Sequence, residues 1–391
     1  MTSEWNHFAL GEITELVIDY RGKTPKKLGG DWCKQGYRAL SAKNIKTGRI
    51  VQAETIRYID ESLYQKWMKD EVQRGDILIT SEAPFGQIFF WDSDEKIVLS
   101  QRLFCVRIKP EYDARFIYYY MTTPEFQSEL DGRATGTTVI GLRQPELMKC
   151  IIRCPEIQEQ KVIAAILSSI DAKIIANEKV NDNLADLLQT IYQERFVNDI
   201  LAVNQGVLSD ICSYSRDKVA VSELNIRTYF STENMLSGKA GSTEATSLPT
   251  TSQTTACHKG DTLISNIRPY FKKIVYCEDN CGCSTDVLCF TPSQPRYSAY
   301  LFSTLYADKF FAFMVAGSKG TKMPRGDKQQ IMTYPVVLPS EEALAGFNTI
   351  ASPLLEQIYS NRAENKRLSI LRDTLLPKLM SGEIDVSAVQ L

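Results

Sequence analysis

Basic side chains gather with glycine and threonine in short loops at three places in the sequence. Residues 21–27 carry four basic groups and no acid, and their glycine and proline indicate an exposed turn. Arg133 precedes Ala-Thr-Gly-Thr-Thr, with Arg143 beyond, and residues 319–325 again combine lysine, glycine and threonine. Lysines neutralise phosphates, and arginines can recognise base edges with paired hydrogen bonds. The loops are predicted to contact nucleic acid; the competing interpretation is a solvated charged surface.

Two segments with different polar residues follow equivalent strands, Ser-Glu-Ala-Pro-Phe at 81–85 and Asn-Ile-Arg-Pro-Tyr at 266–270. We expect preferences for different bases to arise there, and Gln101-Arg102 is a further candidate. The predicted nucleic-acid contacts are Arg21, Lys23, Lys26, Lys27, Arg102, Arg133, Thr137, Arg143, Arg268, Lys319, Thr321, Lys322 and Arg325.

Motifs that would indicate catalysis are missing from the sequence. The stretch 317–322 has glycines and lysines without P-loop spacing, and no Pro-Pro pair is present for an adenine methyltransferase motif. Only two histidines are available for acid–base chemistry. A zinc site is conceivable but lacks the Cys-x-x-Cys spacing; it would use Cys257, His258, Cys277, Cys281, Cys283 and Cys289. We expect no catalytic residue, metal or cofactor here; a nuclease or self-contained methyltransferase is the enzymatic alternative.

The composition indicates a soluble globular protein with two domains. The chain has 391 residues, of which 43% are hydrophobic and 24% charged, and its net charge is −2, so positive charge must be local if DNA is bound. The start lacks a secretory signal, and no stretch approaches the ~18 apolar residues of a membrane helix. Ten cysteines at irregular spacing fit reduced thiols, so we expect a cytoplasmic protein without membrane contact.

An internal repeat underlies this organisation. Gly75–Ser81 recurs as Gly260–Asn266 at an offset of 185, and later matches, such as Gly136-Thr137 with Gly320-Thr321, follow at 184. So long a period indicates a duplicated domain rather than a solenoid. Each copy is expected to be a mixed α/β unit, class α+β. The expected elements are a strand after each Gly-Asp, further strands at 97–108 and 284–290, and helices at 114–130 and 296–315.

Each copy ends in a long heptad pattern. The apolar seam of the first copy alternates spacings of four and three, at Ile163, Leu167, Ile170, Ile174, Asn177, Asn181, Leu184, Leu188 and Ile191. The second copy has the same seam at Phe347, Ala351, Leu354, Ile358, Asn361, Asn365, Leu368, Arg372, Leu375 and Leu379. The simpler alternative is that each stripe packs only on its own domain.

Both seams carry two asparagines, four residues apart, at their midpoint. Antiparallel pairing would place Asn177 beside Asn365, and Asn181 beside Asn361, and buried amides that pair would fix register and direction. The fold prediction is therefore two globular domains separated by two long helices in an antiparallel coiled coil, with pseudo-twofold symmetry. Such a spacer suits a two-part target on a polymer.

The sequence resembles the specificity subunits of type I restriction-modification enzymes over essentially its whole length. The resemblance rests on residues 5–13 and 22–25, the Gly-Asp-x-Leu-Ile strands, Pro155–Gln160 with Ile170-Asp171, and above all Leu371–Ile384. The second copy departs from the pattern, since it lacks the early Trp and has Glu-Glu-Ala at 341–343.

The resemblance implies two target recognition domains, at 1–154 and 201–339, each recognising half of a split double-stranded DNA site. Spacer helices at 155–200 and 340–391 would dock methyltransferase subunits, two in number, with restriction/translocase subunits joining them. S-adenosylmethionine, ATP and magnesium would bind to those partners, and this chain would be non-catalytic. The alternative is a scaffold whose duplicated domains bind other proteins.

Overall fold

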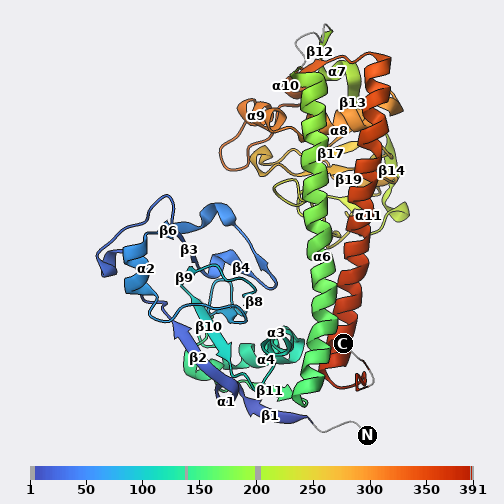
Figure 1. The fold of residues 1–391 in the computed structure, drawn as a ribbon. Coiled ribbons are helices and arrows are strands. Elements are labelled where there is room, and N and C mark those ends of the chain that lie inside the picture. The colour runs from blue at the N-terminus through green and yellow to red at the C-terminus, as the bar shows by residue number, and fades with distance from the viewer. Residues whose placement is uncertain (1–4, 137–139, 199–203, 388, 390–391) are drawn as a thin grey trace. The chain divides into compact units, whose positions relative to one another are not determined.

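The computed structural model describes residues 5–136, 140–198, 204–387 and 389, which form two compact units. Unit 1 comprises Met1–Ile174 and Lys366–Leu391, and unit 2 comprises Ile175–Asn365. Each unit contains one mixed domain of helices and sheets together with part of each long helix, α6 (Ile157–Tyr192) and α11 (Glu341–Met380) (Figure 1).

The main sheet of unit 1 is antiparallel and has the order β2-β10-β7-β8. Its strands are β2 (Thr14–Asp19), β7 (Ile77–Thr80), β8 (Ile88–Phe90) and β10 (Leu103–Ile108). A second sheet has the order β6-β3-β9, from β3 (Tyr37–Leu40), β6 (Arg57–Ile59) and β9 (Ile97–Leu99). The remaining strands pair as β1 (Asn6–Ala9) with β11 (Ile151–Cys154), and β4 (Ile45–Lys46) with β5 (Arg49–Ile50). The short helices are α1 (Leu10–Ile13), α2 (Glu61–Trp67), α3 (Ala114–Met121), α4 (Pro124–Arg133) and α5 (Gln144–Leu147).

Unit 2 repeats this plan. Its main sheet has the order β13-β20-β17-β18, from β13 (Cys212–Tyr214), β17 (Thr262–Ser265), β18 (Ile274–Tyr276) and β20 (Val287–Pro292). Strand β12 (Gln205–Val207) pairs with β21 (Pro335–Val337), as β1 pairs with β11. Where unit 1 has the three-stranded sheet β6-β3-β9, unit 2 has a sheet of four strands. In order, these are β14 (Lys218–Ala220), β16 (Gln253–Cys257), β19 (Cys281–Cys283) and β15 (Tyr229–Phe230). The helices are α7 (Leu208–Ile211), α8 (Ser298–Tyr306), α9 (Asp308–Ala316) and α10 (Lys328–Met332). The predicted duplication is confirmed.

The central strands β7 and β17 are buried at every position because both faces of the main sheet are covered. In β7, Ile77 and Ile79 pack in one core cluster while Leu78 packs in another. In β17, Ile264 and Leu263 are divided in the same way. Side chains of a strand alternate between its faces, so a sheet covered on both sides has no polar face.

The repeated Gly-Asp pair shapes the turn that enters each central strand. Gly75 and Gly260 have φ of 97° and 93°, in the left-handed region that favours glycine. The Asp76 carboxylate accepts the Gln73 backbone N–H, and Asp261 accepts that of His258, each at 2.8 Å. Glycine therefore allows the turn, and aspartate satisfies a backbone donor within it.

The two long helices run antiparallel. In unit 2 the Asn177 side chain donates to Asn365 Oδ1 at 2.8 Å, and Asn361 donates to Asn181 Oδ1 at 2.9 Å. In unit 1 Arg372 Nη1 lies 2.8 Å from Asp171 Oδ1. Residue numbers thus rise along one helix as they fall along the other. These amide contacts are the ones expected from the sequence; their role in fixing the register remains a prediction.

Three expected elements were wrong in their extent. The expected strand at 97–108 is two strands in different sheets, because the chain turns at Ser100–Arg102, where Arg102 has φ of 63°. The expected helix at 114–130 is two helices, since Thr123 is extended and caps α4, whose first residue is Pro124. The expected helix at 296–315 is likewise divided, at Ala307, which is also extended.

Candidate nucleic-acid interface

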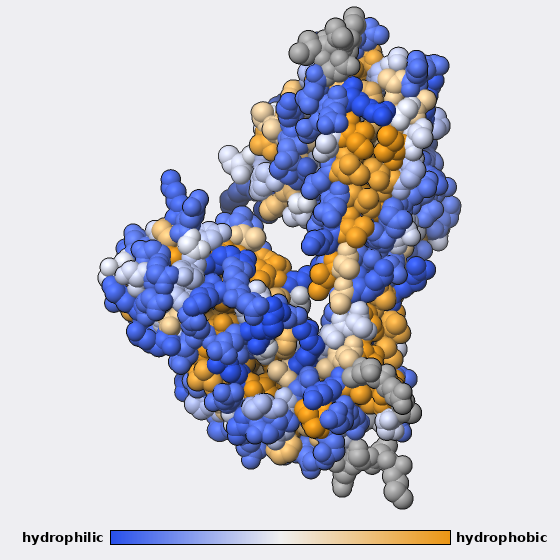
Figure 2. Space-filling model, viewed as in Figure 1, coloured by the Kyte–Doolittle hydropathy of each residue, from blue (hydrophilic) through white to orange (hydrophobic). Residues whose placement is uncertain are grey.

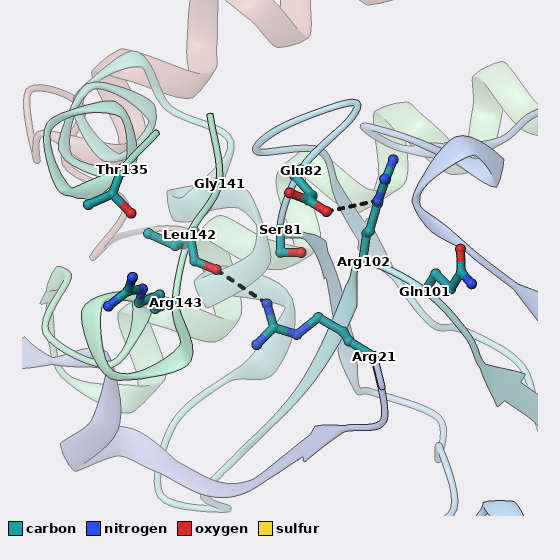
Figure 3. Close-up of a pocket in the computed structure, with 9 residues that line it drawn as sticks. All are labelled: Arg21, Ser81, Glu82, Gln101, Arg102, Thr135, Gly141, Leu142 and Arg143. Atoms are coloured by element: carbon teal, nitrogen blue, oxygen red, sulfur yellow. Dashed lines mark hydrogen bonds and ion pairs between the residues drawn. The ribbon is translucent and has the colours of Figure 1, made fainter. Parts of the chain in front are cut away.

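Three loops of unit 1 meet at the end of strand β7. The Ser81 backbone N–H donates to Arg102 O at 2.9 Å, and its carbonyl accepts the Leu142 N–H at 3.0 Å. A β-bridge joins Thr135 and Gly141 and closes the loop of residues 135–141, which contains Gly136-Thr137 and is called here the Gly-Thr loop. These contacts enclose an open, largely polar cleft of about 460 Å³ (Figure 3). Its lining residues are Arg21, Ser81, Glu82, Gln101, Arg102, Thr135, Gly141, Leu142 and Arg143.

Arg21 is held rigidly within this cleft. Its Nε and Nη2 each lie 2.8 Å from a carboxylate oxygen of Asp19, and Nη1 donates to Leu142 O at 3.4 Å. The guanidinium carbon lies 4.0 Å from the centroid of the Phe104 ring. All three nitrogens therefore have a partner inside the protein, and Arg21 supports the Gly-Thr loop through the Leu142 carbonyl that follows it.

Among the described residues, Arg102 has a partner at one of its nitrogens. Its Nε lies 2.8 Å from Glu82 Oε1, and the side chain is 49% exposed. Figure 3 shows the terminal nitrogens lying beyond this contact. A guanidinium fixed at Nε keeps the N–H donors of both terminal nitrogens available in a defined orientation.

A second hollow of about 510 Å³ shares Gln101 and Arg102 with the cleft. Lys26 lines it, as do Lys43 and Arg57, which the sequence analysis missed. The Arg57 guanidinium lies 5.0 Å from the centroid of the Trp32 ring, a cation–π contact. A signal was present in the sequence, because the basic stretch from Lys43 to Arg49 carries a Thr47-Gly48 turn, in which Gly48 has φ of 74°.

Three predicted residues of unit 1 line neither hollow. Lys23 donates to Trp67 O, and burial, with the nearby Lys69 charge, lowers its pKa. Lys27 donates to Gly22 O at 2.9 Å. Arg133 pairs with Glu129 at 2.9 Å, and this hydrogen bond raises the arginine pKa. Thr137 lies outside the described residues.

The corresponding loops of unit 2 also meet. Arg325 forms β-bridges with Ile267 and with Lys319, closing a second Gly-Thr loop that exposes Thr321 and Lys322. The backbone N–H of Arg268 donates to Pro324 O at 2.8 Å, and its Nη2 donates to Lys322 O at 3.4 Å. Arg268 has φ of 50°, an uncommon conformation fixed here by these bonds.

Ion pairs orient the basic groups of this second set. Arg325 Nη2 lies 3.0 Å from Asp286 Oδ1, and Lys319 Nζ lies 2.6 Å from Asp327 Oδ2. The hydrogen bond from Lys319 lowers the pKa of Asp327. In each unit the loops bring several predicted residues together: Arg21, Arg102 and Arg143 in unit 1, and Arg268, Lys319, Lys322 and Arg325 in unit 2.

The cysteines considered as a zinc site are buried in one core cluster of unit 2. Cys277 and Cys281 have their sulfurs 3.6 Å apart, and the Cys289 thiol donates to Asp261 at 3.2 Å. Within the described part of the chain, no three His, Cys, Asp or Glu side chains are arranged to hold a metal ion. Nor does any described helix have an apolar stretch long enough to cross a membrane.

Residues 2–185 match the family model described as the type I restriction modification DNA specificity domain. The MjaVIII specificity subunit of Methanocaldococcus jannaschii is 28% identical over 46% of this chain and 43% of its own length, so less than half of that relative is spanned. The MjaIX specificity subunit of the same organism is 22% identical over 80% of this chain and 78% of its own. The crystal structure of a type I system S subunit from M. genitalium has the same fold, with a TM-score of 0.61, 17% identity and 96% coverage of both chains.

Proposed function

We propose that this chain, whose residues 2–185 match the family model of the type I restriction modification DNA specificity domain, selects the DNA sequence on which a restriction-modification enzyme acts. The recognition domains are assigned to residues 1–154 and 201–339, with one half of a two-part double-stranded site for each. In this proposal methyl transfer and cleavage take place on other subunits.

One observation carries the proposal: the same constellation of loops is built twice in one chain. In each unit a basic Gly-Thr loop bonds to the segment after the central strand, through Leu142 and Ser81 in unit 1 and through Pro324 and Arg268 in unit 2. The side chains on this shared backbone differ. A common scaffold with different polar groups is what two recognition surfaces for different base sequences require.

The long helices are the proposed docking surface for partner subunits. Figure 2 shows hydrophobic residues along the helices of unit 2, where Ile175, Val180, Leu187 and Ile350 are exposed. Exposed apolar side chains in such number are typical of protein interfaces. We assign this surface to methyltransferase subunits, two per chain, which restriction/translocase subunits would join. S-adenosylmethionine, ATP and magnesium would bind to these partners, in the cytoplasm where the DNA lies.

Selection from a DNA library tests the proposal. The full chain, with and without its methyltransferase partner, would be mixed with duplexes that contain random sequence, and the bound fraction sequenced. We expect enrichment of two short defined sequences separated by undefined bases. If the assembled complex binds all duplexes equally, or retains none of them, the chain does not select sequence and a protein-binding scaffold becomes the better account.

A further inference from the structure

The two units carry side chains of opposite charge at one pair of equivalent positions. Leu103 pairs with Thr80 in unit 1, and Val287 pairs with Ser265 in unit 2, so the preceding residues, Arg102 and Asp286, occupy corresponding places. Their carbonyls confirm the match: Arg102 O accepts the Ser81 N–H at 2.9 Å, and Asp286 O accepts the Asn266 N–H at 2.8 Å.

The Gly-Thr loops also differ in charge at one pair of equivalent positions. The bridge Thr135–Gly141 closes the loop of unit 1, and the bridge Lys319–Arg325 closes that of unit 2 with the same separation in sequence. Gly141 and Arg325 therefore correspond. In unit 1 a β-carbon at position 141 would lie 3.4 Å from Glu82 Oε2, so this position faces the Glu82 carboxylate.

Each unit thus has one arginine paired with a carboxylate beside the end of its central strand, but the arginine comes from a different loop in each unit. In unit 1 Arg102 comes from the turn before β10 and Glu82 from the segment after β7. In unit 2 the acid, Asp286, comes from the turn before β20 and the guanidinium from the Gly-Thr loop. The side chains of Arg102 and Arg325 are 49% and 56% exposed, so both can reach a ligand.

We propose that Arg102 and Arg325 are specificity-determining residues that each recognise a guanine base edge, with Glu82 and Asp286 as their positioning residues. This assignment rests on the proposed function and deepens it. Within the described residues neither terminal nitrogen of Arg102 has a partner, so both are available for the O6 and N7 acceptors of guanine. An exchange of loops would place the two guanidinium groups over different base steps of their half-sites.

The adjacent carboxylate distinguishes these arginines from phosphate contacts. A negative charge within 3.0 Å of the guanidinium repels a phosphate, whereas a base edge is uncharged. Lys26 and Lys43, by contrast, have no carboxylate partner in the described part of the chain and suit phosphates. Arg21 differs from both groups, since each of its nitrogens already has a partner within the protein.

The test is methylation mapping with the full chain and its methyltransferase partner, comparing Arg102→Lys and Arg325→Lys with the parent. Lysine keeps the charge but loses the paired donors. We expect Arg102→Lys to lower discrimination at one G·C position of one half-site by about tenfold to a hundredfold, and Arg325→Lys to do so in the other half-site. Glu82→Gln and Asp286→Asn should affect the same positions as their arginines.

Two ion-paired arginines serve as matched controls. Arg74, 51% exposed and paired with Asp92 and Asp94, comes just before the first residue of β7, whereas the proposed site lies after its last residue. Arg296, 41% exposed and paired with Glu341, follows β20. Arg74→Lys and Arg296→Lys should leave the methylated motif unchanged. Thermal unfolding of every variant shows whether the fold persists, and the milder Glu82→Gln and Asp286→Asn substitutions decide the matter if a lysine variant unfolds.

Particular results would overturn the inference. An unchanged motif in folded Arg102→Lys and Arg325→Lys variants would do so, as would weakening that is equal on all sequences, the result of a phosphate contact. The inference also fails if Glu82 and Arg102 variants alter different positions. If the parent chain itself directs methylation to no two-part site, the proposed function fails first, and the two failures are thereby distinguished.

Discussion

At the scale of single residues, Lys26 and Lys43 are the basic groups best placed for phosphates. Both line the second hollow of unit 1. Replacing both with alanine should weaken binding of the assembled complex about equally on all sequences, because phosphate contacts carry no sequence information. The slope of log affinity against log salt should fall by about 2, near 0.9 for each lost contact. Fluorescence anisotropy at several salt concentrations measures both effects.

The control for this prediction is Lys66→Ala with Lys69→Ala, which removes two exposed lysines that line neither hollow. Its salt slope should stay at the parent value. A loss of selectivity at one base, with the salt slope unchanged in the Lys26 and Lys43 variant, would contradict the phosphate role.

Glu278 gives unit 2 a predicted dependence on pH. Burial raises the pKa of its carboxyl group to about 7, and its Oε1 has no hydrogen-bond partner within the described part of the chain. Since the folded-state pKa lies above the unfolded one, the charged form destabilises the fold above about pH 7, and this penalty disappears as pH falls toward the unfolded value.

Glu278→Gln should therefore stabilise the protein by about 1 kcal/mol at pH 8 and have little effect at pH 4.5, after discounting for screening by water. Denaturant unfolding at the two pH values measures the difference. An equal change in stability at both values would show that the carboxyl does not titrate as proposed.

The residue types of the site followed from the sequence, but their roles depended on tertiary contacts. Lys23 and Arg133 belong to basic loops, yet their side chains bond to Trp67 O and Glu129 within the domain. Lys43 and Arg57 were missed because their shared hollow joins segments distant in sequence. No local pattern distinguishes a solvated lysine from one whose nitrogen is used internally.

At the scale of elements, the asparagine pairs make a testable contribution to helix pairing. Asn361→Leu should lower the free energy of unfolding by about 1–3 kcal/mol, because it leaves the buried amide of Asn181 without its partner. Asn181→Leu combined with Asn361→Leu should recover much of the loss, since two apolar residues then face each other. Denaturant unfolding of the single and double variants provides the comparison.

The register role predicts a separate outcome for the double variant. Cysteines at positions 177 and 365 replace one asparagine pair and report on the other. They should crosslink efficiently while Asn181 and Asn361 are present, and less selectively once both are leucine. Equal crosslinking at the adjacent, out-of-register positions in the parent would contradict a role for the amides in fixing register.

Elements with a regular sequence pattern were predicted well, whereas the points at which one element ends and the next begins were predicted poorly. The heptad seams and the Gly-Asp turns are periodic or fixed in type, so the helices and central strands could be placed from sequence. The turn at Arg102 could not, because an arginine at φ of 63° gives no glycine signal. Thr123-Pro124 is a recognisable helix start, but the apolar residues on both sides suggested one continuous helix.

At the scale of the whole molecule, the exposed apolar residues of the helices predict an assembly surface. Val180→Asp with Leu187→Asp should abolish co-purification of the methyltransferase partner while leaving thermal unfolding nearly unchanged, because both side chains are already exposed. Thr190→Asp, on the same helix at another exposed position, is the matched control. Retention of the partner by the double variant would place the docking surface elsewhere.

The central claim is that one chain recognises two separate sequences with two copies of one domain. Methylation mapping of cells that produce the full chain with its methyltransferase partner tests this most directly, together with Arg268→Ala in unit 2. We predict a motif in two defined parts, of which Arg268→Ala changes one part and leaves the other intact. A single continuous motif in the parent, or a change in both parts or in neither after the substitution, would contradict the account.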